Sequence, residues 1–283
     1  MRKALFLLMF AAVLAGSVQA ATGDDAAGVK AWQRGDYVTA LREFLPLAKS
    51  GNPEAEFRVG FIYCQGSAPN FAEAIRWFQL ASQHGHANAA FNLGQLYALG
   101  QGVPKNQVEA VKYYRMAANQ GFADAQFKLA VAYDEGNGVA KDYKEAARLY
   151  RLAAMNPHPG QGKTEAEFSL GVLYHEGRGM PKDFKEAAKW FELAADRGDA
   201  QSQYNIGWMY YMPEGVEENF VKAYSWIALS GRTAAGNESV VIQTDASIAG
   251  KAKGTCEELA KKMTPEQLAE AQRIIKAWKP KRN

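Results

Sequence analysis

Long apolar runs are scarce in this sequence. Beyond the first twenty residues, no stretch holds eighteen apolar residues in a row, the length that a helix needs to cross a bilayer. Charge of one sign is missing too, because the formal net charge is +3 and falls to +1 when the two basic residues Arg2 and Lys3 are subtracted. A net charge this close to zero gives no reason to expect a nucleic acid as partner. We therefore expect a soluble mature protein.

Motifs of the common nucleophilic and zinc enzymes are absent as well. No Ser is followed by Lys three residues later, and neither G-x-S-x-G nor H-E-x-x-H occurs. His84 and His86 offer two metal ligands, but nothing nearby suggests a third, and we interpret the pair as part of a turn. The sequence therefore predicts no catalytic residue, no metal, no cofactor and no nucleotide site.

The first twenty residues, MRKALFLLMFAAVLAGSVQA, have the layout of an export signal. Arg2 and Lys3 precede an apolar run that is too short to span a bilayer, and Val18 and Ala20 have the spacing that signal peptidase favours. Ser17 stands where a lipoprotein would carry its lipidated Cys. The pattern predicts a signal peptide cut after Ala20, a periplasmic or secreted protein, and neither a lipid anchor nor membrane insertion of the mature chain.

A fivefold internal repeat is the main feature that the sequence does contain. It recurs as PEAEFRVGFIYCQG, ANAAFNLGQLYALGQG, ADAQFKLAVAYDEGNG, TEAEFSLGVLYHEGRG and AQSQYNIGWMYYMPEG, and an Ala-rich, aromatic stretch follows each copy. One tyrosine per copy gives spacings of 34, 36, 41 and 36 residues: Tyr63, Tyr97, Tyr133, Tyr174 and Tyr210. Apolar residues recur every three or four positions in both halves of a unit, so each unit is predicted to be a helical hairpin.

Small residues punctuate the predicted hairpins. Gly177 and Gly179, which have counterparts in other units, are predicted to end the first helix and turn the chain, and Asp183 is predicted to cap the second helix. A small residue at one position of each first helix is expected to let the two helices approach closely: Gly60, Gly94, Ala130, Gly171 and Gly207.

The pattern Ala-x-x-x-Leu-Gly-x-x-Tyr-x-x-Gly-x-Gly-Val, followed by Asp and then Ala-x-x-Trp-Phe-x-x-Ala-Ala, resembles the Sel-1-like repeat family, a relative of the tetratricopeptide repeat. The resemblance implies an all-α fold, a right-handed α/α superhelical solenoid of helical hairpin repeats with N- and C-terminal capping helices. The predicted parts are a signal peptide at 1–20, a capping half-repeat at 21–51, five repeats at 52–234, an irregular insertion at 235–254, and capping helices with a basic tail at 255–283.

A stretch between the third and fourth repeats, GQGKT from Gly160 to Thr164, resembles the end of a phosphate-binding loop. A full G-x-x-x-x-G-K-[ST] motif would need Gly in place of Pro157 and a β-strand before it. The five extra residues of this junction instead predict a lengthened turn. Thr164 and Glu167 have the spacing of a capping box for the helix that follows.

The chain has only two cysteines, Cys64 and Cys256. Cys64 ends the first helix of the first repeat, whereas Cys256 lies beyond the fifth, and a disulfide needs Cα atoms within about 7 Å of each other. We predict no bond between them, and the sequence leaves open whether each is free or pairs with another molecule.

Positions beside the Leu-Gly-x-x-Tyr stripe are predicted to line a binding groove, because first helices line the concave face of the related tetratricopeptide fold. These positions hold different residues in different units. Recognition of a partner would require such variation, and drift at exposed sites would also produce it. The predicted binding residues are Phe61, Gln95, Val131, Asp134, Val172, His175, Trp208, Tyr211 and Met212. Their sharpest cluster is Trp208, Tyr211 and Met212, since exposed aromatics and Met favour recognition.

The resemblance implies a non-catalytic scaffold, an exported adaptor in envelope assembly or signalling that binds a protein or peptide of unidentified nature through its groove. The alternative is a hydrolase or binder acting on a β-lactam or cell-wall-like substrate, an activity linked to cysteine-rich secreted relatives. Those relatives carry a cysteine pair in each repeat, and this chain does not. The two hypotheses differ in the changes that should abolish function. Charge reversal across several groove positions should abolish the function of an adaptor, whereas loss of one polar residue should abolish that of an enzyme.

Overall fold

The computed structural model describes residues 26–65, 69–158, 160, 162–234 and 246–281. The predicted signal peptide, its cut after Ala20, and residues 235–245 of the predicted insertion lie outside the described residues. Within the described ranges every regular element is a helix, and none of these helices is long and apolar enough to cross a membrane. The chain divides into two compact units, residues 1–142 with 156–161, and residues 143–155 with 162–283.

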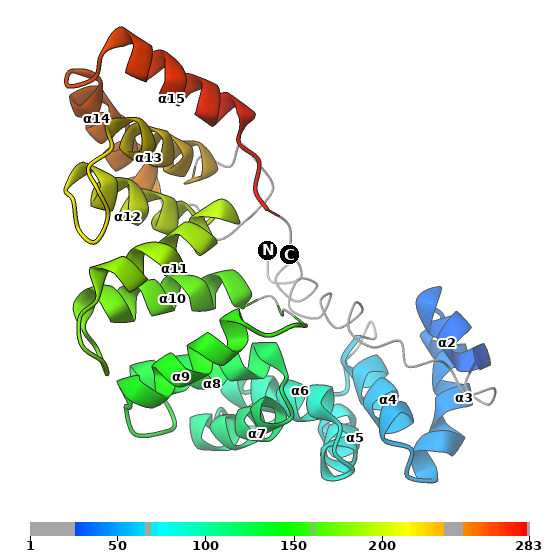
Figure 1. The fold of residues 1–283 in the computed structure, drawn as a ribbon. Helices are drawn as coiled ribbons and strands as arrows, with labels where there is room; N and C mark the ends of the chain where they lie inside the picture. The colour runs from blue at the N-terminus through cyan, green and yellow to red at the C-terminus, as the bar shows by residue number, and fades with distance from the viewer. Residues whose placement is uncertain (1–25, 66–68, 159, 161, 235–245, 282–283) are drawn as a thin grey trace. The chain divides into compact units, whose positions relative to one another are not determined.

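The first unit consists of helices that pack in sequence order, each on the next (Figure 1). They are α2 (Ala26–Gln33), α3 (Tyr37–Lys49), α4 (Pro53–Gln65), α5 (Phe71–Gln83), α6 (Ala87–Leu99), α7 (Gln107–Asn119) and α8 (Ala123–Glu135). Helices α2 and α3 both lie within the capping half-repeat predicted at 21–51.

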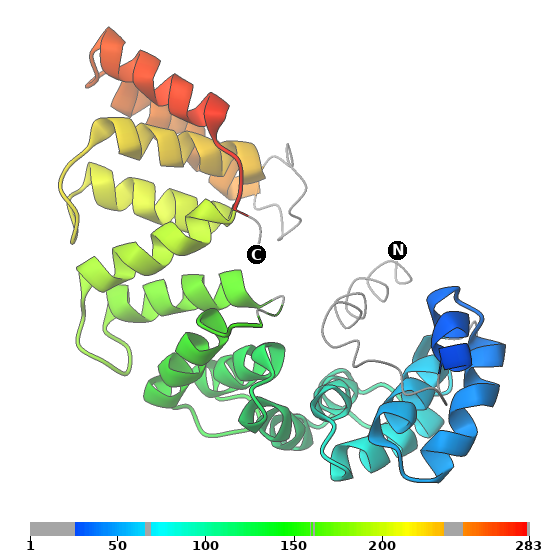
Figure 2. The same ribbon diagram turned by 45° about the vertical axis from the view of Figure 1, so that its right-hand side comes forward.

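The second unit continues the same pattern up to its C-terminal helices, as the turned view shows (Figure 2). Its helices are α9 (Tyr143–Ala154), α10 (Lys163–Glu176), α11 (Phe184–Asp196), α12 (Ala200–Tyr211), α13 (Phe220–Ala234), α14 (Ala246–Ala260) and α15 (Pro265–Ala277). Helix α13 packs against α12, α14 and α15.

The helices of a hairpin approach each other through glycine. A Cβ built on Gly94 of α6 would lie 2.5 Å from the ring of Tyr114, and one on Gly171 of α10 would lie 2.6 Å from the ring of Phe191. The second helices carry alanines at one repeated position, and these are fully buried: Ala74, Ala110, Ala146, Ala187 and Ala223. The predicted role of the small residues is thus confirmed, because added bulk would force the helices apart.

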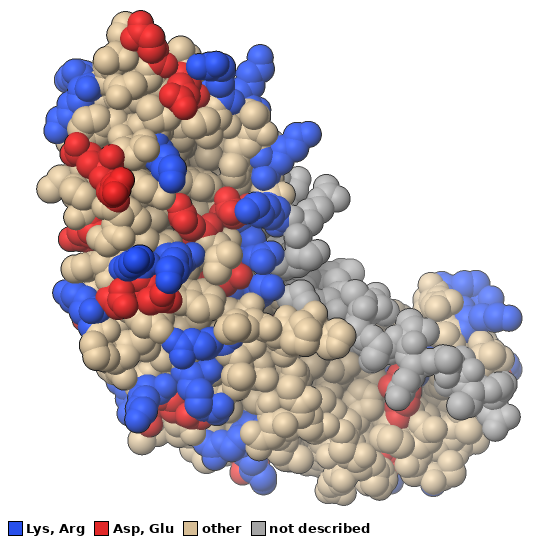
Figure 3. Space-filling model, in the orientation of Figure 1, with Lys and Arg blue, Asp and Glu red and all other residues tan. Residues whose placement is uncertain are grey.

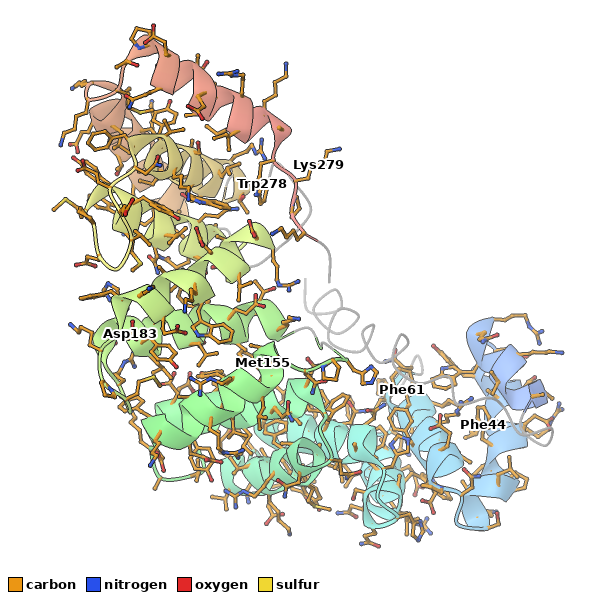
Figure 4. The ribbon with its side chains drawn as sticks, viewed as in Figure 1. Phe44, Phe61, Met155, Asp183, Trp278 and Lys279 are labelled. Atoms are coloured by element: carbon orange, nitrogen blue, oxygen red, sulfur yellow. The ribbon has the colours of Figure 1, made fainter. Side chains whose placement is uncertain are left out.

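The loops of the second, third and fourth repeats each hold two glycines with different roles. The first, such as Gly177 with φ of 71°, is the left-handed residue that ends the first helix, as predicted. The second also packs against the start of the preceding second helix, and a Cβ on Gly179 would lie 2.5 Å from the backbone carbon of Tyr143. Asp183 then caps α11 by accepting a hydrogen bond from the Glu186 amide at 3.0 Å (Figure 4). The loops therefore join neighbouring repeats as well as turning the chain.

In the third, fourth and fifth repeats the repeat tyrosine bonds to the second helix of the preceding repeat. Tyr133 accepts a hydrogen bond from Arg115 at 2.7 Å, and Tyr174 accepts one from Arg151. For Tyr210 of the fifth repeat, the equivalent position in the preceding second helix holds a carboxylate instead of Arg. Tyr210 therefore donates a hydrogen bond to Glu192 at 2.6 Å. Burial and then this carboxylate raise the pKa of Tyr210 above its usual value.

A polar network joins α4 to the turn before α6. Glu54 accepts a hydrogen bond from Arg58 Nε at 2.7 Å and lies 3.0 Å from His86 Nε2. His86 Nδ1 accepts from the Ala89 amide at 3.3 Å and caps α6, so its Nε2 carries the proton that bonds Glu54. His84 is the C-cap of α5, and the two histidines therefore form a turn, as the sequence predicts.

The junction between the third and fourth repeats differs from the prediction in one detail. Helix α10 begins at Lys163 with Gly162 as its N-cap, so Thr164 lies inside the first turn and is not the capping residue. Gly160 lies so close to Asp124 that a Cβ would be 2.0 Å from the carboxylate oxygen. An acidic group beside this backbone would repel a phosphate, which argues against a phosphate-binding loop at this junction.

The predicted irregular insertion at 235–254 is wrong for its second part, because α14 begins at Ala246. One face of α14 is apolar and buried through Ile248, Ala252 and Leu259, and this face packs on the preceding repeat. This apolar face is hard to recognise in the sequence because glycines and lysines interrupt it, among them Gly250, Gly254 and the lysines between them.

The last helix lies within the capping helices predicted at 255–283. Thr264 and Gln267 form a reciprocal capping box at the start of α15, with Pro265 at the first helical position. Beyond α15, the Trp278 ring lies 6.5 Å from that of Trp226, and the Lys281 amide donates to the Asp196 carbonyl at 2.8 Å. The residues after α15, which Figure 4 marks at Trp278 and Lys279, thus reach the end of α11.

Candidate binding surface on the first helices

The predicted binding residues are shared between the two compact units. Phe61, on α4 of the first unit, is only 4% exposed, and its ring lies 5.6 Å from that of Trp32 on α2. The prediction that Phe61 lines a groove is therefore wrong, because Trp32 of the capping helix packs against it in the first repeat. Gln95 on α6 and both Val131 and Asp134 on α8 are half-buried.

In the second unit four predicted residues line one depression of about 500 Å³, which we call the α10–α12 pocket. Val172 and His175 come from α10, and Trp208 and Met212 come from α12 and its C-cap. The remaining lining residues are Glu176, Phe191, Asn205, Met209 and Glu214. The volume lies in the range of ligand-binding pockets in proteins.

The floor of the α10–α12 pocket is apolar. Phe191 of α11 and Met209 of α12 are 2% and 3% exposed, and both belong to the core of the unit. Above them Trp208 is half-buried, whereas Met212 is 57% exposed although large and apolar. An apolar floor with a half-buried aromatic and an exposed Met at its edge is the composition found at recognition surfaces.

Tyr211 does not line the pocket but packs behind Trp208. The two ring centroids are 5.3 Å apart, and Tyr211 lies 6.2 Å from Phe220 on its other side. The Lys262 ammonium lies 4.8 Å from the Tyr211 ring centroid, and a hydrogen bond to Tyr211 raises the pKa of Lys262. Tyr211 therefore supports the Trp208 ring from outside the pocket.

The polar groups of the pocket are mainly acidic. His175 Nε2 lies 3.0 Å from Glu214 Oε2, and Glu176 forms an ion pair with Arg178. Glu176 and Glu214 are both exposed, and no Lys or Arg is among the lining residues. Elsewhere, over the face of the second unit that Figure 3 shows, basic and acidic side chains alternate.

The loop after α12 fixes Glu214 in place. The Met212 amide donates to the Trp208 carbonyl at 2.7 Å, and the Glu214 amide donates to the Met209 carbonyl at 3.3 Å. Gly215 has φ of 73°, and a Cβ there would lie 2.3 Å from the backbone carbon of Phe184. This close approach holds the loop against α11, so that Glu214 faces His175 without help from a ligand.

Five lining residues were not predicted from the sequence. Phe191 and Met209 belong to the repeated core stripes, so the sequence does not indicate that they also form the floor of the pocket. Glu176 directly follows a predicted groove residue, and Glu214 follows Pro213, which departs from the repeat pattern by replacing a loop glycine. That departure was the one available signal that the loop of the fifth repeat differs from the others.

Chemistry beyond binding finds little support among the described residues. They contain no cluster of three or more His, Cys, Asp or Glu that could hold a metal ion. Cys64 is buried and Cys256 half-buried, and both are free in the structure. Burial raises the pKa of Cys64 to about 12 and that of Cys256 to about 11, so neither forms a reactive thiolate near neutral pH.

Comparison with known proteins agrees with these features. The model of the Sel1 repeat matches at residues 53–86, 87–122, 123–158, 164–199 and 200–231. A Sel1 repeat protein from Oxalobacter formigenes has a similar structure, with a TM-score of 0.69 and 28% identity over 83% of this chain and 99% of that one. A comparison with curated proteins finds no match.

A protective antigen of uropathogenic Escherichia coli strains with an SLR fold is also similar, with a TM-score of 0.62 and 28% identity. The match covers 85% of this chain and 53% of the antigen, so the chain corresponds to about half of that protein's length. Five matched repeats cover most of the sequence, and their spacing is the one that the tyrosines give. The chain belongs to the Sel1 repeat family and is an all-α solenoid of helical hairpin repeats.

Proposed function

We propose that this protein is an exported, non-catalytic scaffold that binds a protein or peptide partner through the α10–α12 pocket and acts as an adaptor in the bacterial envelope. Sel1 repeat solenoids are typically scaffolds for protein–protein interaction, and that general role supports the proposal. The single observation that carries it is the exposed Met212 beside Trp208 above an apolar floor. Buried aromatic and Met anchors surrounded by polar groups are the usual centre of a protein interface.

The pocket favours binding over hydrolysis. Its lining contains no Ser, Thr, Cys or Lys to serve as a nucleophile beside His175 and Glu214. We therefore expect the purified mature chain to hydrolyse a chromogenic cephalosporin no faster than buffer alone does. Turnover that follows the protein through purification and disappears in His175→Ala would contradict this part of the proposal.

Site-specific photocrosslinking in the bacterium of origin tests the binding role. A photoreactive amino acid replaces Met212 in one strain and Lys185, an exposed residue at the start of α11, in a control strain. We expect irradiation to give a covalent adduct with a discrete protein from position 212 and none from position 185. Identical adducts from both positions, or none above background from position 212, would contradict the proposal.

A further inference from the structure

The permanently charged side chains that line the α10–α12 pocket are acidic. Its lining holds two exposed carboxylates, Glu176 and Glu214, and one His but no cationic side chain that is always charged. The two carboxylates come from the end of α10 and from the loop after α12. Both therefore belong to segments next to the α10–α12 pocket, and a ligand lying there would meet net negative charge.

Each carboxylate has capacity left for another donor. Glu214 uses Oε2 toward His175, and Glu176 uses Oε2 toward Arg178. A carboxylate offers about four lone-pair sites on its two oxygens, so one existing contact does not saturate it. An incoming ammonium or guanidinium group would find charge-assisted acceptors that need no rearrangement of the loop.

Trp208 adds a second feature that favours a cation. Indole is the best of the aromatic rings at attracting Lys or Arg over its face. This chain already uses the same pairing elsewhere, since Lys262 lies 4.8 Å from the Tyr211 ring and Arg58 lies 4.8 Å from the Trp32 ring. Beside these groups, the apolar floor of Phe191 and Met209 and the exposed Met212 would contact an uncharged side chain.

From this charge complementarity we propose that the α10–α12 pocket binds a peptide segment of the partner in which a Lys or Arg side chain lies next to an apolar one. The inference rests on the proposed function and adds the chemistry of the bound segment. The apolar side chain contacts Met212 and the floor, and the cationic side chain lies between Trp208 and the two carboxylates. An acidic segment is disfavoured because its charge would face Glu176 and Glu214.

Selection from a phage-displayed library of random heptapeptides tests this proposal on the mature chain. We expect selected peptides to be enriched in Lys or Arg beside an aliphatic or aromatic residue. The double variant Glu176→Gln/Glu214→Gln removes the two pocket carboxylates. Its matched control, Glu217→Gln/Glu218→Gln, makes the same charge change at two exposed residues that do not line the pocket. Both control residues lie in the loop that holds Glu214.

Calorimetric titration of the best selected peptide then gives the size of the effect. Two exposed ion pairs predict binding to the pocket double variant weakened about tenfold, and binding to the control double variant unchanged within about twofold. Thermal unfolding followed by circular dichroism confirms that both variants are folded. Equal affinity for the two double variants would overturn the proposal.

The outcomes separate this inference from the proposed function. Peptides without basic residues whose binding is weakened by Met212→Ala would overturn the cationic preference while leaving a peptide-binding pocket in place. Peptides whose affinity is unaffected by Met212→Ala would show that binding occurs elsewhere and overturn both. A selection that enriches no peptide above the level seen on an unrelated helical protein would also overturn both.

Discussion

One residue type, glycine, has opposite consequences at different places in this chain. Gly171 faces the Phe191 ring across a hairpin, Gly215 holds a left-handed turn against α11, and Gly250 has open space around it. The first two are required by packing and backbone conformation, whereas the third only weakens its helix. The local surroundings of a residue therefore decide its contribution, and the repeat pattern predicts those surroundings only at the recurring positions.

Gly171→Ala and Gly250→Ala add the same methyl group and should change stability in opposite directions. The new Cβ at 171 would lie 2.6 Å from the Phe191 ring and displace it, so we expect a loss of about 1–3 kcal/mol in the free energy of unfolding. At 250 nothing lies within 4 Å, so better helix propensity should add about 0.5–1 kcal/mol. Urea denaturation of both variants measures the difference, and equal shifts would contradict the packing argument.

Glu54 should make the first unit sensitive to acid. Burial opposes its charged form, but the hydrogen bonds from His86 and Arg58 outweigh burial and hold the pKa of Glu54 below its usual value of 4.5. A carboxyl whose pKa is lower in the folded state contributes stability that is complete above about pH 4.5 and is lost as the pH falls through the folded pKa.

The variant Glu54→Gln tests this sign. We expect it to cost about 1–2 kcal/mol near pH 7 and much less at an acidic pH below the lowered pKa of Glu54, where the wild-type carboxyl is also protonated. Glu135→Gln, at an exposed position of α8, serves as the control with no comparable pH-dependent difference. A cost for Glu54→Gln that is the same at both pH values, measured by urea denaturation, would show that the charge of Glu54 is not what stabilises the network.

At the scale of helices, packing contacts recur in three forms, the first within a hairpin and the other two between neighbouring repeats. Glycine of one hairpin admits the ring of the other helix, the second loop glycine packs on the preceding repeat, and the repeat tyrosine bonds back to the preceding second helix. A solenoid gains its stability from such nearest-neighbour contacts, so its end repeats need covers. Helix α2 covers the first repeat through Trp32, and α14 and α15 cover α13 of the fifth.

Trp278 anchors the C-terminal cover, and its removal should loosen that cover selectively. Its ring contacts Trp226 of α13 and lies under Arg232, whose guanidinium also donates to the Ile275 carbonyl at 3.1 Å. We expect Trp278→Ala to cost about 2 kcal/mol, less than a fully buried tryptophan because the side chain is half-buried. Hydrogen exchange should then speed up in α13 and α15 and stay unchanged in α4 and α5. Faster exchange throughout the chain would contradict a local cover.

Most of the fold could be predicted from the sequence because the repeat shows the same physical constraint several times. Gly60, Gly94, Gly171 and Gly207 identify a close approach that one glycine alone would not. Features that occur once were harder to predict, as the start of α10 at Lys163 and the helix α14 show. In α14 the buried face consists of Ile248, Ala252 and Leu259 among glycine and lysine, too weak a period to distinguish from a loop.

The candidate site could be predicted only in part for a related reason. Sequence position indicates which face of a first helix a residue occupies, so Val172, His175, Trp208 and Met212 were named together. It does not indicate what covers that face, and so Phe61 was misplaced, because Trp32 comes from a helix outside the repeats. Glu214 lies in a loop whose path depends on Gly215 packing against Phe184, a contact between distant residues that has no local pattern.

At the scale of the whole molecule, the proposed role depends on where the protein is located. An adaptor of the envelope must leave the cytoplasm, and the proposal draws on the basic start, short apolar run and small residues of the first twenty positions. The two cysteines are free in the structure and do not indicate a compartment.

We therefore expect the full chain to be exported and cut after Ala20. Intact mass spectrometry of the protein from the periplasmic fraction should give the mass of a chain that begins at Ala21. A variant with Ala20→Arg should accumulate uncut, because signal peptidase requires a small residue at that site, and a chain lacking residues 2–20 should stay in the cytoplasm. If the full chain is recovered from the cytoplasm with residues 1–20 intact, the envelope role is wrong. The α10–α12 pocket would then have to recognise a cytoplasmic partner, which the same peptide selection would still characterise.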